Sequence, residues 1–169
     1  MLLKKIPSLL GVLAVFAVSY APFAYSHTAE IQQAREEVKA SVADAADYIA
    51  ENGPDDAFTE FSNMDSDFYQ DHTFIFAIDY AGDILATPIK PELIGTNQYN
   101  AKSSDGKHFI KDMIAMAKSG GGWVKYRVHN PRTSQEECKN SYVMPMNNDN
   151  YLIGSGYYYI PMNKAGKCL

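Results

Sequence analysis

The sequence has few of the features that mark an enzyme or a metalloprotein. The motifs G-x-S-x-G and H-E-x-x-H and the P-loop are all absent, so no nucleophile elbow, zinc helix or phosphate cradle is indicated. There are only two cysteines, with no C-x-x-C pair and no adjacent histidine. Reactive or metal-binding thiols are therefore not expected. We predict a protein without catalytic residues, metal or cofactor.

Basic residues are scarce beyond the start of the chain. Residues 1–26 resemble an export signal, with Lys4 and Lys5, an apolar run at 9–18, and Ala24 and Ser26 before the expected cleavage site. The run is shorter than the roughly 20 residues of a membrane span, although an uncleaved anchor is the alternative. Without the two lysines, 13 of the 15 basic residues remain against 20 acidic ones, a formal charge of −7. This charge argues against nucleic acid or an anionic membrane as partner.

Long apolar stretches, repeats and low-complexity tracts are missing after residue 26. Residues 27–169 are long enough for one domain with one core, and we expect no separate output domain in this chain. An exported protein is periplasmic or secreted, and thiols oxidise there. Cys138 and Cys168 are therefore predicted to form a disulfide that closes a loop of about 30 residues.

Hydrophobic periodicity predicts an α+β domain. Residues 29–52 have apolar side chains at helical spacing, and Gly53-Pro54 is a stop signal. A short helix at 55–61, a strand at 72–79, a strand at 84–87 and a helix at 107–118 are expected to follow. Three further strands are expected at 123–129, 139–145 and 151–160. This order is typical of helices packed on one antiparallel sheet.

An ordered set of motifs also resembles a known family. The C-terminal half contains Gly-Gly-Gly-Trp-Val-Lys-Tyr at 120–126, Lys-Asn-Ser-Tyr-Val at 139–143 and Ile-Gly-Ser-Gly-Tyr-Tyr at 153–158. Upstream are FIFAIDYAGDILATP at 74–88, PELIGTN at 91–97 and SDGKHFIKDM at 104–113. Over residues 30–160 the chain resembles the single Cache domain, an extracytoplasmic sensor fold related to PAS.

The resemblance implies a long N-terminal helix packed on a five-stranded antiparallel PAS-like sheet with strand order 2-1-5-4-3. The strand at 123–129 would then be an edge, and its charged Lys125 and Arg127 suit an edge. Small metabolites such as acetate, propionate, pyruvate or lactate would bind on the sheet face opposite the long helix. Many relatives carry a histidine where Thr87 stands here, which leaves the anion preference open.

The candidate site centres on two glycines of the last strand. Gly154 and Gly156 point to the same face, and a bare strip there indicates either close packing or space for a ligand. Aromatic rings and donors nearby would suit a carboxylate. Trp123 and Tyr126 have opposite parity, so a regular strand cannot direct both to one pocket. The predicted ligand-binding residues are Phe76, Thr87, Trp123, Tyr126, Lys139, Tyr142, Gly156 and Tyr157.

We therefore expect an exported sensor domain that binds a small carboxylate and acts on a membrane receptor or sensor kinase. Its long helix could also form a homodimer. One alternative is a structural or interaction module whose pocket is filled by its own side chains. The other is a metal-binding protein, using the acidic loop around Asp65 and Asp67 or an N-terminal His27. The loop has Phe68 and Phe74 where an EF-hand needs Gly and Glu.

Overall fold

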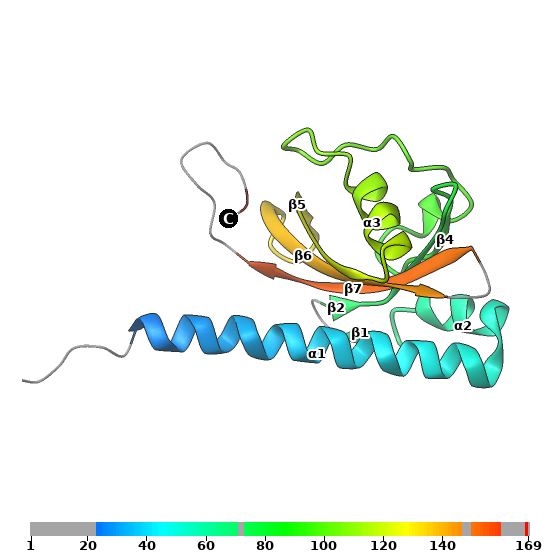
Figure 1. Cartoon of the computed structure of the whole chain (residues 1–169), viewed down its shortest axis with the longest axis horizontal. Coiled ribbons are helices and arrows are strands. Elements are labelled where there is room, and N and C mark those ends of the chain that lie inside the picture. Colours follow the sequence, from blue (N-terminus) through cyan, green and yellow to red (C-terminus); the bar gives the residue numbers. More distant parts are fainter. Residues whose placement is uncertain (1–22, 71–72, 147–149, 160–167, 169) are drawn as a thin grey trace, which may run out of the picture.

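The computed structural model describes residues 23–70, 73–146, 150–159 and 168, with side chains from residue 29 onward (Figure 1). The predicted export signal therefore lies mostly outside the described residues. No helix within these ranges is long and apolar enough to cross a membrane. The helices are α1 (Phe23–Asn52), α2 (Pro54–Phe61), the 3-10 turn η1 (Pro91–Leu93) and α3 (Phe109–Lys118). The strands are β1 (Tyr69–Gln70), β2 (Thr73–Phe74), β3 (Phe76–Asp79), β4 (Ile84–Ala86), β5 (Gly122–Asn130), β6 (Gln135–Met146) and β7 (Tyr151–Tyr159).

The main sheet has five antiparallel strands in the order β4-β3-β7-β6-β5. This is the predicted order 2-1-5-4-3, with β5 at one edge as expected. Figure 1 shows α1 and α2 on one face of the sheet and α3 on the other. The predicted α+β architecture, a long N-terminal helix on a five-stranded antiparallel sheet, is confirmed.

Helix α1 lies on the sheet through one apolar stripe. Val38, Val42, Ala45 and Ile49 are all buried, and three- or four-residue spacing puts them on one face. Val42, Ala45 and Ile49 form one core cluster with sheet residues that include Ile153. The helix ends where Gly53 adopts a φ of 83°, a backbone conformation that favours glycine, and Pro54 opens α2.

Helix α3 covers the opposite face. Ile110, Met113 and Ile114 form a second core with residues that include Val143 and Leu152. The helix leads into β5 through three glycines. A side chain at Gly121 would stand 2.8 Å from the carbonyl oxygen of Val143, so this turn needs a residue without Cβ.

The predicted strand at 72–79 is split into two. β2 pairs with β1 in a separate two-stranded sheet, while β3 pairs with β4 and β7. Ile75 lies between them, and its N–H donates to the carbonyl of Phe68. The strand breaks because its hydrogen-bonding partner changes at this residue.

The structure joins Cys138 and Cys168 in a disulfide, as the sequence predicts. Cys138 is fully buried in β6, so the bond fixes the end of the chain to the centre of the sheet.

A candidate ligand pocket around a buried lysine

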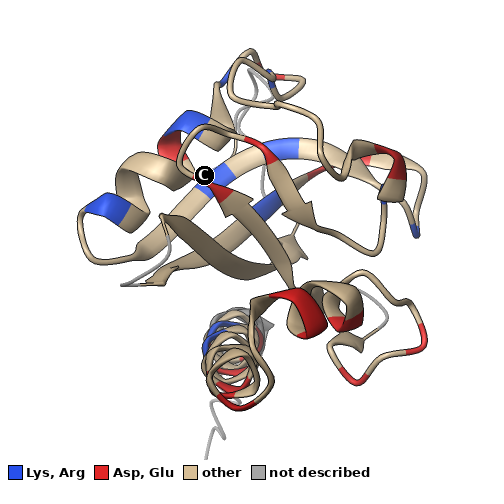
Figure 2. Ribbon diagram, turned by 90° about the vertical axis from the view of Figure 1, so that its right-hand side faces the viewer, with Lys and Arg blue, Asp and Glu red and all other residues tan. Residues whose placement is uncertain are grey.

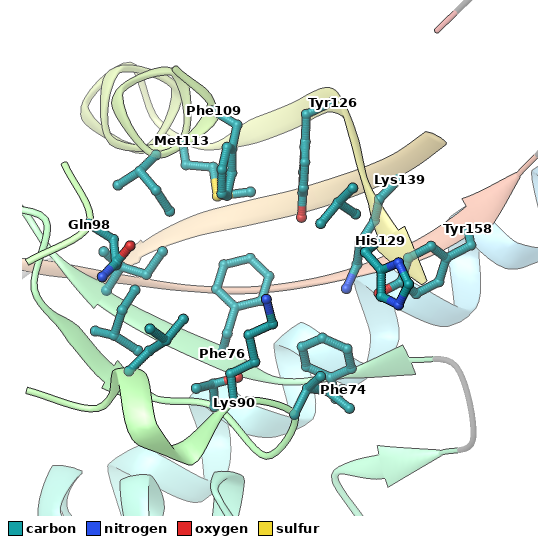
Figure 3. Close-up of a pocket in the computed structure, with 17 residues that line it drawn as sticks. Phe74, Phe76, Lys90, Gln98, Phe109, Met113, Tyr126, His129, Lys139 and Tyr158 are labelled. Atoms are coloured by element: carbon teal, nitrogen blue, oxygen red, sulfur yellow. The ribbon is translucent and has the colours of Figure 1, made fainter. Parts of the chain in front are cut away.

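A cavity of about 170 Å³ lies between the sheet and α3 (Figure 3). It is on the face opposite α1, where the family resemblance implies that ligands bind. Seventeen side chains from both layers and from the segment after β4 line it: Phe74, Phe76, Ile78, Ile84, Thr87, Ile89, Lys90, Leu93, Gln98, Phe109, Ile110, Met113, Tyr126, Val128, His129, Lys139 and Tyr158.

The segment after β4 forms one wall because a tight turn returns the chain beside β3. Three backbone N–H groups, from residues 81 to 83, donate to Oδ1 of Asp79 at 2.8–2.9 Å. Gly82 then packs so closely on Tyr99 that a Cβ would lie 2.6 Å from the tyrosine Cβ. The turn therefore positions both β4 and the segment around Tyr99 beside the cavity.

Lys139 is the buried cation of the pocket. Its side chain comes from β6, between Tyr126 on β5 and Tyr158 on β7, and the residue is only 2% exposed. Its Nζ lies 3.7 Å from the ring centroid of Phe74 and 4.8 Å from that of Tyr158. In the part of the chain that the structure describes, no carboxylate is within ion-pair distance of it. Burial lowers the pKa of the Lys139 ammonium to about 7.

Two phenols flank this lysine. The Tyr126 ring stacks on Phe109, with centroids 4.7 Å apart and planes at 12°, and its hydroxyl shares a 3.0 Å hydrogen bond with Ser141 Oγ. Burial raises the pKa of Tyr126 well above its ordinary value. Burial, reinforced by the negative charge of Glu137, raises the pKa of Tyr158 to about 12. Both phenols are therefore neutral at physiological pH and supply no counter-ion for Lys139.

More exposed polar groups line the rest of the cavity. Lys90 and His129 are exposed, and Gln98 is half-buried. The Gln98 amide donates to Thr96 Oγ1 at 2.9 Å. Figure 3 shows the Lys90 and Gln98 side chains directed into the cavity from the segment after β4.

The net negative charge of the protein is located away from the pocket. Residues 23–61, which include α1 and α2, carry nine acidic and two basic side chains, whereas residues 62–169 carry eleven of each. Figure 2 shows acidic residues along α1 and α2, on the opposite side of the sheet from α3. An anion approaching the pocket therefore meets a locally neutral part of an acidic protein.

The structure brings four of the eight predicted site residues together. Phe76, Thr87, Tyr126 and Lys139 line the cavity, and Thr87 is buried. Their role in binding stays a prediction.

Trp123, Tyr142 and Tyr157 lie instead on the α1 face of the sheet. The Trp123 ring contacts the other two, at centroid distances of 5.3 and 5.9 Å, and Arg35 of α1 lies 4.4 Å above it. The expectation that these rings surround one pocket with Tyr126 is wrong. Strand alternation explains the separation, because residues an odd number of positions apart point to opposite faces.

The two glycines of β7 are sites of close packing. A Cβ at Gly154 would lie 2.6 Å from the Phe76 ring, and one at Gly156 would meet the Ser141 side chain and lie 2.7 Å from the Asn140 carbonyl oxygen. Gly156 does not line the cavity. The missing side chains of these glycines therefore leave room for neighbouring residues and not for a ligand. This is the close packing that was expected as one of two possibilities.

Most of the other cavity residues were not predicted, among them Phe74, Tyr158 and all those after β4 except Thr87. Tyr158 was within reach of the argument, because it has the same parity as Gly154 and Gly156 along β7. Lys90 and Gln98 had no local signal, since an irregular segment carries no periodicity.

The metal alternatives gain no support from the described residues. Among them, no group of three or more His, Cys, Asp or Glu side chains is arranged to hold a metal ion. Asp71, His72 and the side chain of His27 lie outside this set.

The helices and the five-stranded antiparallel sheet have the PAS-like fold of a Cache domain. Residues 24–167 match the family model for Single Cache domain 2, so the chain belongs to the single Cache domain family of extracytoplasmic sensors. An 85-residue stretch is 32% identical to the sensor histidine kinase MctS of Rhizobium johnstonii, covering 50% of this chain but 18% of the kinase.

Solved structures show the same fold. A methyl-accepting chemotaxis protein from Vibrio parahaemolyticus superposes with a TM-score of 0.69 at 22% identity, over 80% of this chain and 95% of that one. A Cache chemosensory domain studied for its recognition of carboxylic acids gives 0.63 at 22% identity, over 83% of this chain and all of its own.

Proposed function

We propose that this domain binds a small carboxylate in the pocket, with the Lys139 ammonium as its ion-pair partner, and that occupancy is passed to a membrane receptor or sensor kinase. We further propose that residues 1–26 export the chain and that residues 27–169 are the binding domain, in the periplasm or outside the cell. The sensor kinase and chemotaxis proteins to which the chain is similar support a signalling role.

The observation that carries the proposal is the burial of Lys139 in an apolar cavity without a carboxylate partner in the described chain. Buried lysines are rare unless they are paired, because removing an ammonium from water is costly. A carboxylate ligand would provide the missing charge and a charge-assisted hydrogen bond.

The dimensions of the pocket favour a small acid. A cavity of about 150 Å³ can hold benzene, and the present one is about 170 Å³. Acetate, propionate, pyruvate and lactate fit this size. The rings of Phe76 and Phe109 and the side chain of Met113 would contact their carbon chains, while Thr87 is a hydroxyl within the same cavity.

A matched pair of ligands tests the proposal. Propionate and propionamide have nearly the same shape, but only propionate carries a charge. Thermal shift and calorimetry on the purified domain should detect propionate, or another of the four acids, and should find that the corresponding amide binds much more weakly. Lys139→Met should weaken binding of the acid by about 10- to 150-fold, the equivalent of one charge-assisted hydrogen bond.

Lys102→Met is the matched control, because Lys102 is exposed and does not line the cavity. It should leave affinity unchanged. If none of the acids bound, or if Lys139→Met bound them as tightly as the wild type, the proposed site would be wrong.

A further inference from the structure

We infer that the pocket takes up one proton together with each carboxylate, so that the species it recognises is the acid as a whole, carboxylate plus H⁺. This inference rests on the carboxylate site proposed above and adds the protonation state of that site before binding.

In the empty pocket Lys139 is surrounded by aromatic rings and not by counter-charges. Its Nζ contacts the faces of Phe74 and Tyr158, and the residue is almost fully buried. Aromatic faces attract a cation, but they replace its hydration only in part. With no carboxylate nearby in the described ranges, desolvation favours the neutral amine, consistent with the lowered pKa of Lys139, about 7.

The ionisable groups facing Lys139 do not reverse this preference. Tyr126 on β5 and Tyr158 on β7 are neutral phenols, and Lys90 after β4 lines the same cavity with a positive charge. Glu137, two residues earlier in β6, accepts hydrogen bonds from Asn130 Nδ2 at 2.8 Å and from Thr133 Oγ1.

His129, on β5, is a further titratable group lining the cavity. It is exposed, and a neutral imidazole has a nitrogen that can accept a proton. It therefore needs its own control.

Binding a carboxylate changes the protonation state of Lys139. Above neutral pH the empty site holds a neutral amine, and the reaction is Lys-NH₂ + H⁺ + RCOO⁻ giving Lys-NH₃⁺ paired with RCOO⁻. The proton comes from solvent and remains on Nζ, because the carboxylate favours the charged form. With a free-site pKa of about 7, about 0.9 proton is taken up per ligand at pH 8 and about 0.1 at pH 6.

Linkage then fixes the pH dependence of affinity. Wherever binding takes up one proton, the dissociation constant for total acid rises about tenfold per pH unit. Below the pKa of the empty site the amine is already protonated, so affinity becomes independent of pH while the acid itself remains ionised. The domain should therefore respond most strongly to an acid in acidified surroundings.

Calorimetry in paired buffers tests the inference. Sodium propionate, or whichever of the four acids gives the largest thermal shift, is titrated into the wild-type domain at pH 8 in HEPES and in Tris, whose ionisation enthalpies differ. The difference in apparent enthalpy gives the number of protons exchanged. We expect about 0.9 taken up at pH 8 and, in a second buffer pair, about 0.1 at pH 6.

Two variants assign the proton. Lys139→Arg keeps a cation that stays protonated, so its uptake at pH 8 should fall to zero. His129→Gln should retain the wild-type uptake. Loss of uptake in His129→Gln would overturn the inference, as would wild-type binding at pH 8 without any uptake, a result that stands even if Lys139→Arg does not fold. Absence of binding at both pH values would overturn the proposed carboxylate site, and this inference with it.

Discussion

Replacing Lys139 with Met should make the ligand-free domain more stable, even though it removes a residue from the centre of the sheet. Met has a similar length and no charge, and most of the side chains that line the site are apolar or aromatic. The wild-type protein must bury an ammonium, or deprotonate it, each time it folds. The variant has no such cost.

The magnitude follows from the pKa of Lys139, which is lowered from 10.5 to about 7 in the folded protein. At 1.36 kcal/mol per pKa unit, this difference corresponds to about 5 kcal/mol. We therefore expect Lys139→Met to raise the free energy of unfolding by several kcal/mol at pH 6, up to about 5 kcal/mol.

The predicted stability difference should depend on pH, because folding changes the protonation of Lys139. Between pH 7 and 10.5 the unfolded chain holds a proton on Lys139 that the folded chain has lost, so the stability of the wild type rises with pH in this window. Below pH 7 both states are protonated and the full penalty applies. The advantage of the Met variant should therefore be largest at pH 6 and shrink steadily towards pH 10.

Urea unfolding of wild type and variant at pH 6, 7, 8 and 9 measures this difference, provided that the m-values agree. Lys102→Met, at an exposed position, should show no comparable difference at any pH. A carboxylate at 100 times the wild-type Kd should narrow the difference at pH 6, because it adds about 2.7 kcal/mol to the wild type and less to the variant, which binds it more weakly. A Met variant less stable than wild type at pH 6, or a difference independent of pH, would refute the reasoning.

Three further predictions concern packing, the disulfide and the long helix. Gly154→Ala should destabilise the fold by about 1–3 kcal/mol because its Cβ meets the Phe76 ring, and Phe76→Leu should recover part of this loss in the double variant, measured by urea unfolding. Reducing the disulfide should cost about 3–4 kcal/mol in the chain-entropy model, seen as a lower Tm, and unreduced protein should show no thiol in a denaturing assay. Arg35→Met should cost about 0.5–1 kcal/mol through the lost contact with Trp123, and faster hydrogen exchange in α1 would locate the effect there; an unchanged exchange rate would count against that contact.

Local signals in the sequence predicted most of the framework. The stripe from Val38 to Ile49 could bury its apolar face only as a helix, and Gly53-Pro54 marked where that helix stops. The short apolar runs between turn residues became β3 to β7 with small shifts in their ends. The main difference, the break at Ile75, depends on a change of strand partner that no local pattern records.

Only half of the candidate site was predicted. Strand alternation shows which residues of a strand share one face of the sheet, but it does not show which helix covers that face. Counting residues along the strand places Tyr126 and Trp123 on opposite faces of the sheet. Only the packing of α3 against Val124 and Val143 shows that the pocket lies on the face that carries Tyr126. The segment after β4 forms part of the cavity wall because it folds back beside the sheet. Its sequence has no hydrophobic periodicity from which this position could be predicted.

By itself, the sequence determined the order of elements, the sheet of one α+β domain and the pairing of two cysteines, since these depend on periodicity, turn residues and composition. The tertiary structure alone decided the character of Lys139. In the sequence it is an ordinary lysine within a strand. Strand register places it between Tyr126 and Tyr158, and the layers around it exclude water. Burial without a carboxylate partner in the described chain is a property of the assembled layers, because the hydration of a charge depends on everything that surrounds it.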